Sequence, residues 1–89
     1  MEEFVIIANQ TLTNEEEVIY SNNKGAVVKT ILLFNQNEAE QKIILTFDEV
    51  AFSYTLSPKD TKIIDSPIFT KKIKASGELI NIHITGLQL

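Results

Sequence analysis

Residues 43–56 read IILTFDEVAFSYTL, and this stretch decides the fold class of the chain. Apolar side chains occupy every second position from Ile43 to Phe47 and again from Val50 to Leu56. Successive side chains of a β-strand point to opposite faces, so each run builds one apolar face. Asp48 and Glu49 lie between the two runs, where a turn would reverse the chain. The stretch therefore predicts a β-hairpin.

The turn of this hairpin lacks the glycine that a tight turn prefers. Two-residue turns of type I′ hold both central residues at positive φ, which Asn-Gly and Asp-Gly tolerate best. Because Asp48-Glu49 contains no glycine, we expect a loop wider than two residues.

Strand-like segments precede and follow the hairpin. They are short, recur at a spacing of roughly ten residues, and lack helical periodicity. They span residues 4–9, 18–20, 26–35, 61–65, 68–69, 71–75 and 79–85. Turn-forming residues separate several of them, notably in Ser21–Gly25 and Ser57–Asp60. Residues 36–41 are too few for a stable helix, so we expect a loop there.

Two kinds of strand occur in this pattern. Residues 26–35 are apolar on both faces, with Val28 expected on the same face as Leu32 and Phe34, whereas residues 71–75 are apolar on one face only. A strand with two apolar faces is central in its sheet. This mixture favours two stacked layers over a barrel of sequential hairpins. We predict an all-β fold, an antiparallel β-sandwich that is jelly-roll-like, with about eight short strands.

The composition limits the classes of partner. The 89 residues are expected to form one domain, residues 1–89, and 44% of them are hydrophobic, enough for a core. A net charge of −4 argues against binding to nucleic acid or to an anionic membrane surface. The chain has no cysteine, and its first residues, MEEFVIIANQ, do not resemble a secretory signal. We therefore expect a protein that is made in the cytoplasm.

Few residues have the spacing that catalysis or metal binding needs. His83 is the sole histidine, and it faces the polar side of its predicted strand. A catalytic triad or a multi-histidine metal site has little support, because a nucleophile needs a base and an orienting group. Carboxylates cluster at residues 15–17 and 48–49 without the spacing of a calcium loop, so we interpret them as a solvated rim. We predict no catalytic residues, no metal and no cofactor.

Three side chains are candidates for a surface contact. Tyr20 and Tyr54 can reach the surface with their hydroxyl groups, and His83 has an exposed setting in its strand. Stacking of tyrosine on sugar would make the chain a glycan-binding module, which we keep as the alternative function. A basic patch formed by Lys71, Lys72 and Lys74 is expected to pair with the acidic clusters.

The order of strands and turns also resembles a known group of proteins. The segments that carry the resemblance are residues 10–13 (QTLT), 17–20 (EVIY), 25–35 (GAVVKTILLFN), 56–65 (LSPKDTKIID), 67–69 (PIF), 73–77 (IKASG) and 80–86 (INIHITG). Together they are similar to small β-sandwich proteins encoded among the structural genes of tailed bacteriophages of Gram-positive hosts, which serve as capsid decoration, head-fibre or tail-associated modules. Relatives tend to have Asp-Gly at the hairpin, where this chain has Asp48-Glu49.

The resemblance implies a virion structural protein without enzyme activity, and it carries over no site residues. It implies other virion proteins as partners and the virion as the location. Self-association would cover exposed strand edges, so we also expect a homo-oligomer, with a trimer favoured.

Overall fold

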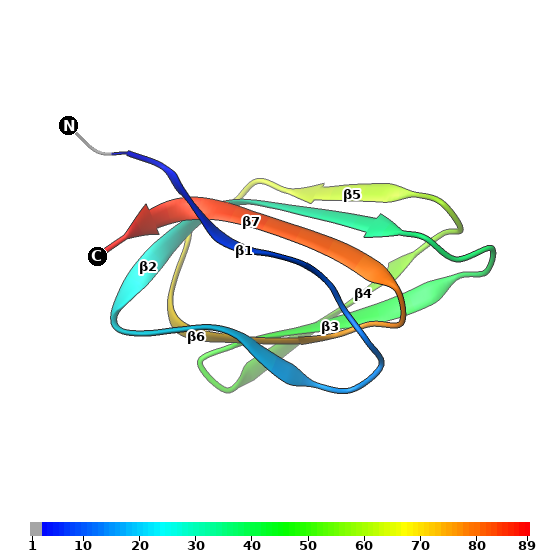
Figure 1. The fold of residues 1–89 in the computed structure, drawn as a ribbon, viewed down its shortest axis with the longest axis horizontal. Coiled ribbons are helices and arrows are strands. Elements are labelled where there is room, and N and C mark those ends of the chain that lie inside the picture. The colour runs from blue at the N-terminus through cyan, green and yellow to red at the C-terminus, as the bar shows by residue number, and fades with distance from the viewer. Residues whose placement is uncertain (1–2) are drawn as a thin grey trace.

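The computed structural model describes residues 3–89, which form seven β-strands and no helix (Figure 1). All strand pairs are antiparallel and belong to one hydrogen-bonded sheet, in the order β1-β7-β2-β6-β3-β4, with β5 paired to β2. The strands are β1 (Val5–Thr11), β2 (Glu17–Asn35), β3 (Gln41–Phe47), β4 (Val50–Leu56), β5 (Thr61–Ile64), β6 (Ile68–Ser76) and β7 (Ile80–Gln88). The all-β antiparallel class predicted from the sequence is confirmed.

Strand β2 gives the sheet its shape. Its pairing with β6 runs from Glu17 to Val28, residues 26–35 pair with β7, and residues 31–34 also pair with β5, so residues 26–28 have β6 on one side and β7 on the other. Figure 1 shows β2 passing through the lower part of the molecule, turning, and returning through the upper part. The sheet therefore folds over on itself. Since hydrogen bonds join all seven strands into a single sheet, the two-sheet sandwich with a jelly-roll topology is not confirmed by this connectivity.

Two expected breaks between strands do not occur. The turn-forming residues Ser21–Gly25 lie inside β2, where the pairing with β6 is irregular between Ser21 and Ala26. Gly25 absorbs the irregularity with a φ of 87°, which glycine adopts without steric cost. Likewise, segments 68–69 and 71–75 are parts of one strand, β6. The chain consequently has seven strands instead of about eight, and β2 and β6 are longer than expected.

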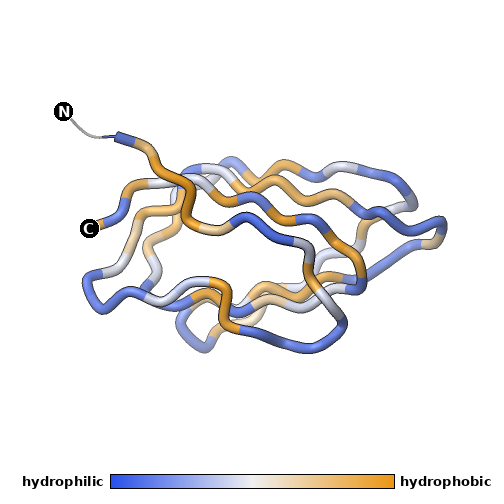
Figure 2. The backbone as a smooth tube through the Cα atoms, viewed as in Figure 1, coloured by the Kyte–Doolittle hydropathy of each residue, from blue (hydrophilic) through white to orange (hydrophobic). Residues whose placement is uncertain are grey.

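The core lies between the two halves of the folded sheet. Alternate residues of β7, Ile80, Ile82 and Ile84, are at most 1% exposed, and they belong to one apolar cluster with residues of β2 and β3 such as Leu33 and Ile43. Figure 2 shows apolar residues along the strands and polar residues at the turns. Burying one such side chain contributes about 1.5–3 kcal/mol. The alternating apolar residues that predicted strands therefore also form the core.

The hairpin turn is tighter than expected. Phe47 pairs directly with Val50, so the turn has only two residues, and Asp48 and Glu49 have φ values of 49° and 73°. The expectation of a wider loop was wrong, because contacts with β6 hold the strained turn. The Asp48 carboxylate accepts hydrogen bonds from the backbone amides of Lys71 and Lys72, at 2.9 and 3.0 Å. The Lys71 amide contributes most to lowering the pKa of Asp48 below its ordinary value.

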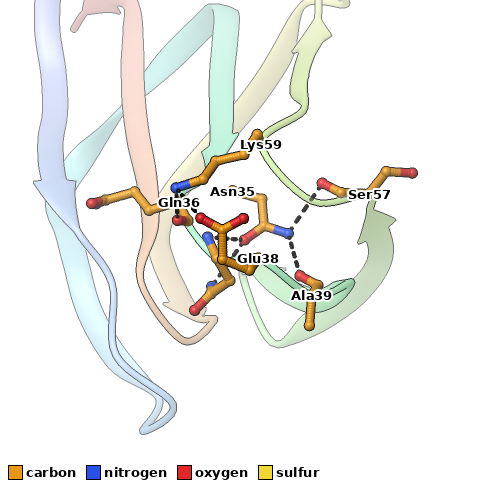
Figure 3. Close-up of polar contacts among 7 residues, drawn as sticks. Asn35, Gln36, Glu38, Ala39, Ser57 and Lys59 are labelled. Carbon is orange, nitrogen blue, oxygen red and sulfur yellow. Dashed lines mark hydrogen bonds and ion pairs between the residues drawn. The ribbon is translucent and has the colours of Figure 1, made fainter.

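A buried asparagine ties the loops together at one end of the molecule (Figure 3). The Asn35 side-chain amide lies 3.0–3.2 Å from the carbonyl oxygens of Ala39, Leu56 and Ser57, and its oxygen accepts hydrogen bonds from Asn37. The Asn35 side chain is fully buried, and these bonds satisfy its polar atoms. The loops after β2 and β4 are thereby fixed to the end of the sheet.

Gly86 allows β7 to lie against β2. A Cβ atom at this position would overlap the carbonyl oxygen of Val27 and lie 2.9 Å from Val28 Cα, both backbone atoms. We predict that Gly86→Ala lowers the free energy of unfolding by about 3 kcal/mol, since the backbone of β2 would have to shift. Urea denaturation followed by circular dichroism measures the change.

Gly77→Ala is the matched control for this variant. Its added Cβ would lie 2.9 Å from Ile80 Cγ1 and 3.3 Å from Ile43 Cγ1, which are side-chain atoms and can move without a shift of the backbone. A loss of stability from Gly86→Ala that is no larger than that from Gly77→Ala would contradict the close approach.

Asp48→Asn tests the charge that holds the hairpin turn. A pKa lowered by folding contributes stability above the unfolded value of 3.8, and this contribution disappears as the pH falls through the folded pKa. We expect the urea midpoint of Asp48→Asn to lie below that of the parent at pH 7 and the gap to narrow at a pH below 3.8, as the carboxylate of folded Asp48 becomes protonated. Glu49→Gln, which alters the exposed neighbouring carboxylate, should change the midpoint little. A gap for Asp48→Asn that is the same at both pH values would exclude this role of the charge.

Candidate functional site

A shallow, open groove of about 470 Å³ lies on the outward face of β5, β2, β7 and β1. Strand register places Leu32 of β2 beside His83 of β7, and His83 beside Asn9 of β1. A second row crosses the same face one step along the strands, from Phe34 to Asn81. The groove therefore crosses the outward face from β5 to β1.

Hydrogen bonds fix the polar side chains at one end of the groove. The Asn81 side-chain oxygen accepts a hydrogen bond from Thr11 Oγ1 at 2.7 Å and another from the Gln36 amide. His83 lies next to Asn81 along the groove and is half-buried. The side chains that line the groove bear no carboxylate or amine, so it offers amide, hydroxyl, imidazole and aromatic groups. Such groups suit a neutral, hydroxyl-bearing ligand better than an ion.

The groove includes two residues whose placement was not expected. Leu32 and Phe34 were predicted on the same face as Val28, but Val28 is fully buried while Leu32 is 38% exposed. A bulge causes the difference, because Val28 pairs with Gly86 whereas Thr30 pairs with the adjacent Thr85. An extra residue in one strand reverses the faces of all that follow. A bulge of this kind leaves no signature in the sequence of β2 alone.

The three candidate contact residues do not form one site. His83 lines the outward groove, whereas Tyr20 and Tyr54 are half-buried and pack against the core. The Tyr20 hydroxyl accepts a hydrogen bond from the Asn22 amide at 3.0 Å. The ring of Tyr54 faces Lys62, whose Nζ lies 5.6 Å from the ring centroid. Both tyrosines are thus engaged within the molecule.

Charged groups form separate surface contacts. Lys74 Nζ lies 3.6 Å from Glu49 Oε1, so one lysine of the basic patch pairs with an acidic cluster, as the sequence predicted. At the opposite end Lys59 pairs with Glu38 at 3.4 Å and donates to the Gln36 carbonyl (Figure 3). Exposed pairs of this kind stabilise a fold by at most about 1 kcal/mol.

Residues 3–89 contain no group of three or more histidine, cysteine or acidic residues that could hold a metal ion. Nor does this part of the chain contain a helix long and apolar enough to span a membrane. No protein-family model matches the chain, and no curated protein is significantly similar to it.

Proposed function

We propose that the chain is a non-enzymatic structural protein of a bacteriophage virion, which self-associates and attaches to the capsid or the tail. The order of the strand segments carries the proposal. When β2 is counted as two segments, one half of the folded sheet reads β1-β7-β2-β5 and the other β2-β6-β3-β4. This order supports a jelly-roll-like sandwich, an architecture that viral capsid proteins and lectins use. The resemblance of the sequence to small phage structural proteins points the same way.

The hydrogen bonds that tie loops to strands support a structural role. The loops after β2 and β4 are tied to Asn35, and the hairpin turn is tied to β6 through Asp48. Buried side-chain polar atoms in residues 3–89 all have hydrogen-bond partners. A domain with fixed loops can present its surface to neighbours with little loss of conformational entropy.

Exposed apolar side chains support self-association. Phe4 and Ile6 on or beside β1, Ile63 on β5, and Phe52 on β4 are each 48–65% exposed. These strands lie at edges of the folded sheet, and a small domain gains stability when such edges are covered. The trimer remains a prediction, as do the virion as location, synthesis in the host cytoplasm, and other virion proteins as partners.

Co-sedimentation with phage particles tests the proposal. We expect the chain to band with intact particles in a density gradient of lysate from cells that produce the encoding phage, since a virion protein stays bound through purification. Mass spectrometry of the band identifies it, and an abundant host cytosolic protein serves as the contamination control. A chain found wholly in the slowly sedimenting soluble fraction would contradict the proposal.

The outward groove favours one alternative, a host-surface glycan-binding module. Phe34 lines it together with the amide of Asn81 and the imidazole of His83. If a glycan binds in the groove, His83→Ala should weaken its binding about tenfold, because a hydrogen bond of about 1.4 kcal/mol would be lost. Tyr20→Ala and Tyr54→Ala, which lie outside the groove, should leave binding unchanged once folding is verified. A glycan array without a specific signal would remove this alternative.

A further inference from the structure

Strand β4 is an edge strand without the usual protection against pairing. In the described part of the chain it pairs with β3 alone, in a regular register from Gln41–Leu56 to Phe47–Val50. Its seven residues, VAFSYTL, include no charge, no proline and no glycine. A regularly paired, uncharged edge of this composition is a template for another strand.

The other edge strands of the sheet have features that hinder pairing with another strand. Strand β1 has an irregular register between Ile6 and Ala8, and β5 is only four residues long. The first part of β2 begins with Glu17 and has irregular pairing at two places. Bulges, short strands and charges are the devices that prevent edge-to-edge pairing. Strand β4 has none of these devices.

The length of the turn before β4 determines which backbone N–H and C=O groups of β4 are free to bind a partner strand. A two-residue turn makes Phe47 and Val50 a hydrogen-bonded pair, and such pairs alternate along an antiparallel ladder. The backbone N–H and C=O groups of the intervening residues therefore point away from β3. These residues are Ala51, Ser53 and Thr55, all exposed and all small.

Apolar side chains lie next to this free edge. Val50 is 57% exposed and Phe52 is 48% exposed, although both lie on the face of β4 that turns toward the core. Phe52 contacts the buried ring of Phe47, with ring centroids 6.0 Å apart. A strand added beside β4 would extend this apolar face and cover part of Phe52.

We propose that the β4 edge pairs antiparallel with β4 of a second copy of the chain, about a two-fold axis at Ser53. Ser53 then lies opposite Ser53 of the second copy, and Ala51 lies opposite its Thr55. In this register the backbones of Ala51, Ser53 and Thr55 each form a hydrogen-bonded pair with the second copy. Phe52 lies opposite Tyr54 of the second copy. This inference rests on the self-association in the proposed function and names the surface that performs it.

A second copy fits the edge because the strand is complementary to itself. Each chain has a net charge of −4, but no charged residue of β4 opposes another in this register. The contact closes after two copies, so it gives a dimer and stands against the trimer prediction. An edge about 24 Å long covers well under the roughly 800 Å² per partner of a stable interface. We therefore expect a weak dimer, with a dissociation constant of roughly 0.1 mM or more.

Disulfide trapping suits a weak contact of known register. The chain has no cysteine, so Ser53→Cys introduces a single thiol. Hydrogen-bonded partners in an antiparallel pair have Cα atoms about 5.5 Å apart, within disulfide range. At roughly 1 mM protein, above the expected dissociation constant, oxidation with diamide should convert most of Ser53→Cys to a species of twice the chain mass on a non-reducing gel.

Two cysteine variants are matched controls. In the proposed register, Ala51 is about 14 Å from Ala51 of the second copy, too far for a disulfide. Ala51→Cys alone should therefore cross-link at least tenfold less than Ser53→Cys, whereas a mixture of Ala51→Cys and Thr55→Cys should form a mixed disulfide. Ser21→Cys, an exposed serine on β2, should also remain uncrosslinked. Circular dichroism verifies that each variant is folded.

Each outcome decides the inference. Selective trapping at Ser53, together with a dimer in light scattering of the parent at high concentration, supports it. Equal trapping at Ser53, Ala51 and Ser21, no trapping at Ser53, or a trimer in solution overturns it. A trimer that bands with phage particles would overturn only the β4 contact, whereas a selective dimer absent from particles would overturn only the virion function.

Discussion

The whole structure depends on one constraint, the hydrogen bonding of a single long strand to three neighbours. Strand β2 pairs with β6, β7 and β5, and it does so by changing direction near Gly25. Gly86 lets β7 approach the bend so closely that a methyl group would not fit. The two halves of the sheet can then face each other across one core of isoleucine, leucine and valine. A rigid β2 without this bend would leave both apolar faces in water.

The same strand decides which side chains meet the solvent. The bulge between Val28 and Thr30 keeps Ile31 and Leu33 in the core and turns Leu32 and Phe34 outward. The outward face consequently has an apolar strip beside Asn81 and His83, and the groove lies along it. The proposed virion role and the glycan alternative use different surfaces of the molecule. The first needs edges and exposed apolar residues, whereas the second needs this groove.

The folded sheet also has edge strands with unpaired backbone groups. A sheet folded on itself without closing into a barrel keeps several free edges. Each edge is either protected from pairing with other strands or paired with a partner. Irregular pairing, shortness and charge protect β1, β5 and the first part of β2. Strand β4 has none of these features, and the tight turn held by Asp48 leads into a regular register with β3. The local chemistry of one turn thus affects how the molecule meets its neighbours.

The sequence alone determined the class of fold, the β3–β4 hairpin, the buried isoleucines of β7 and the polar side of His83, because a period of two assigns side chains to faces whatever the neighbouring strands are. Only the tertiary structure decided that β2 and β6 are continuous, that Leu32 and Phe34 line a groove, and that Asp48-Glu49 form a two-residue turn. Those features depend on bulges and on contacts between residues distant in the chain, such as Asp48 with Lys71. Local periodicity has no information about such contacts.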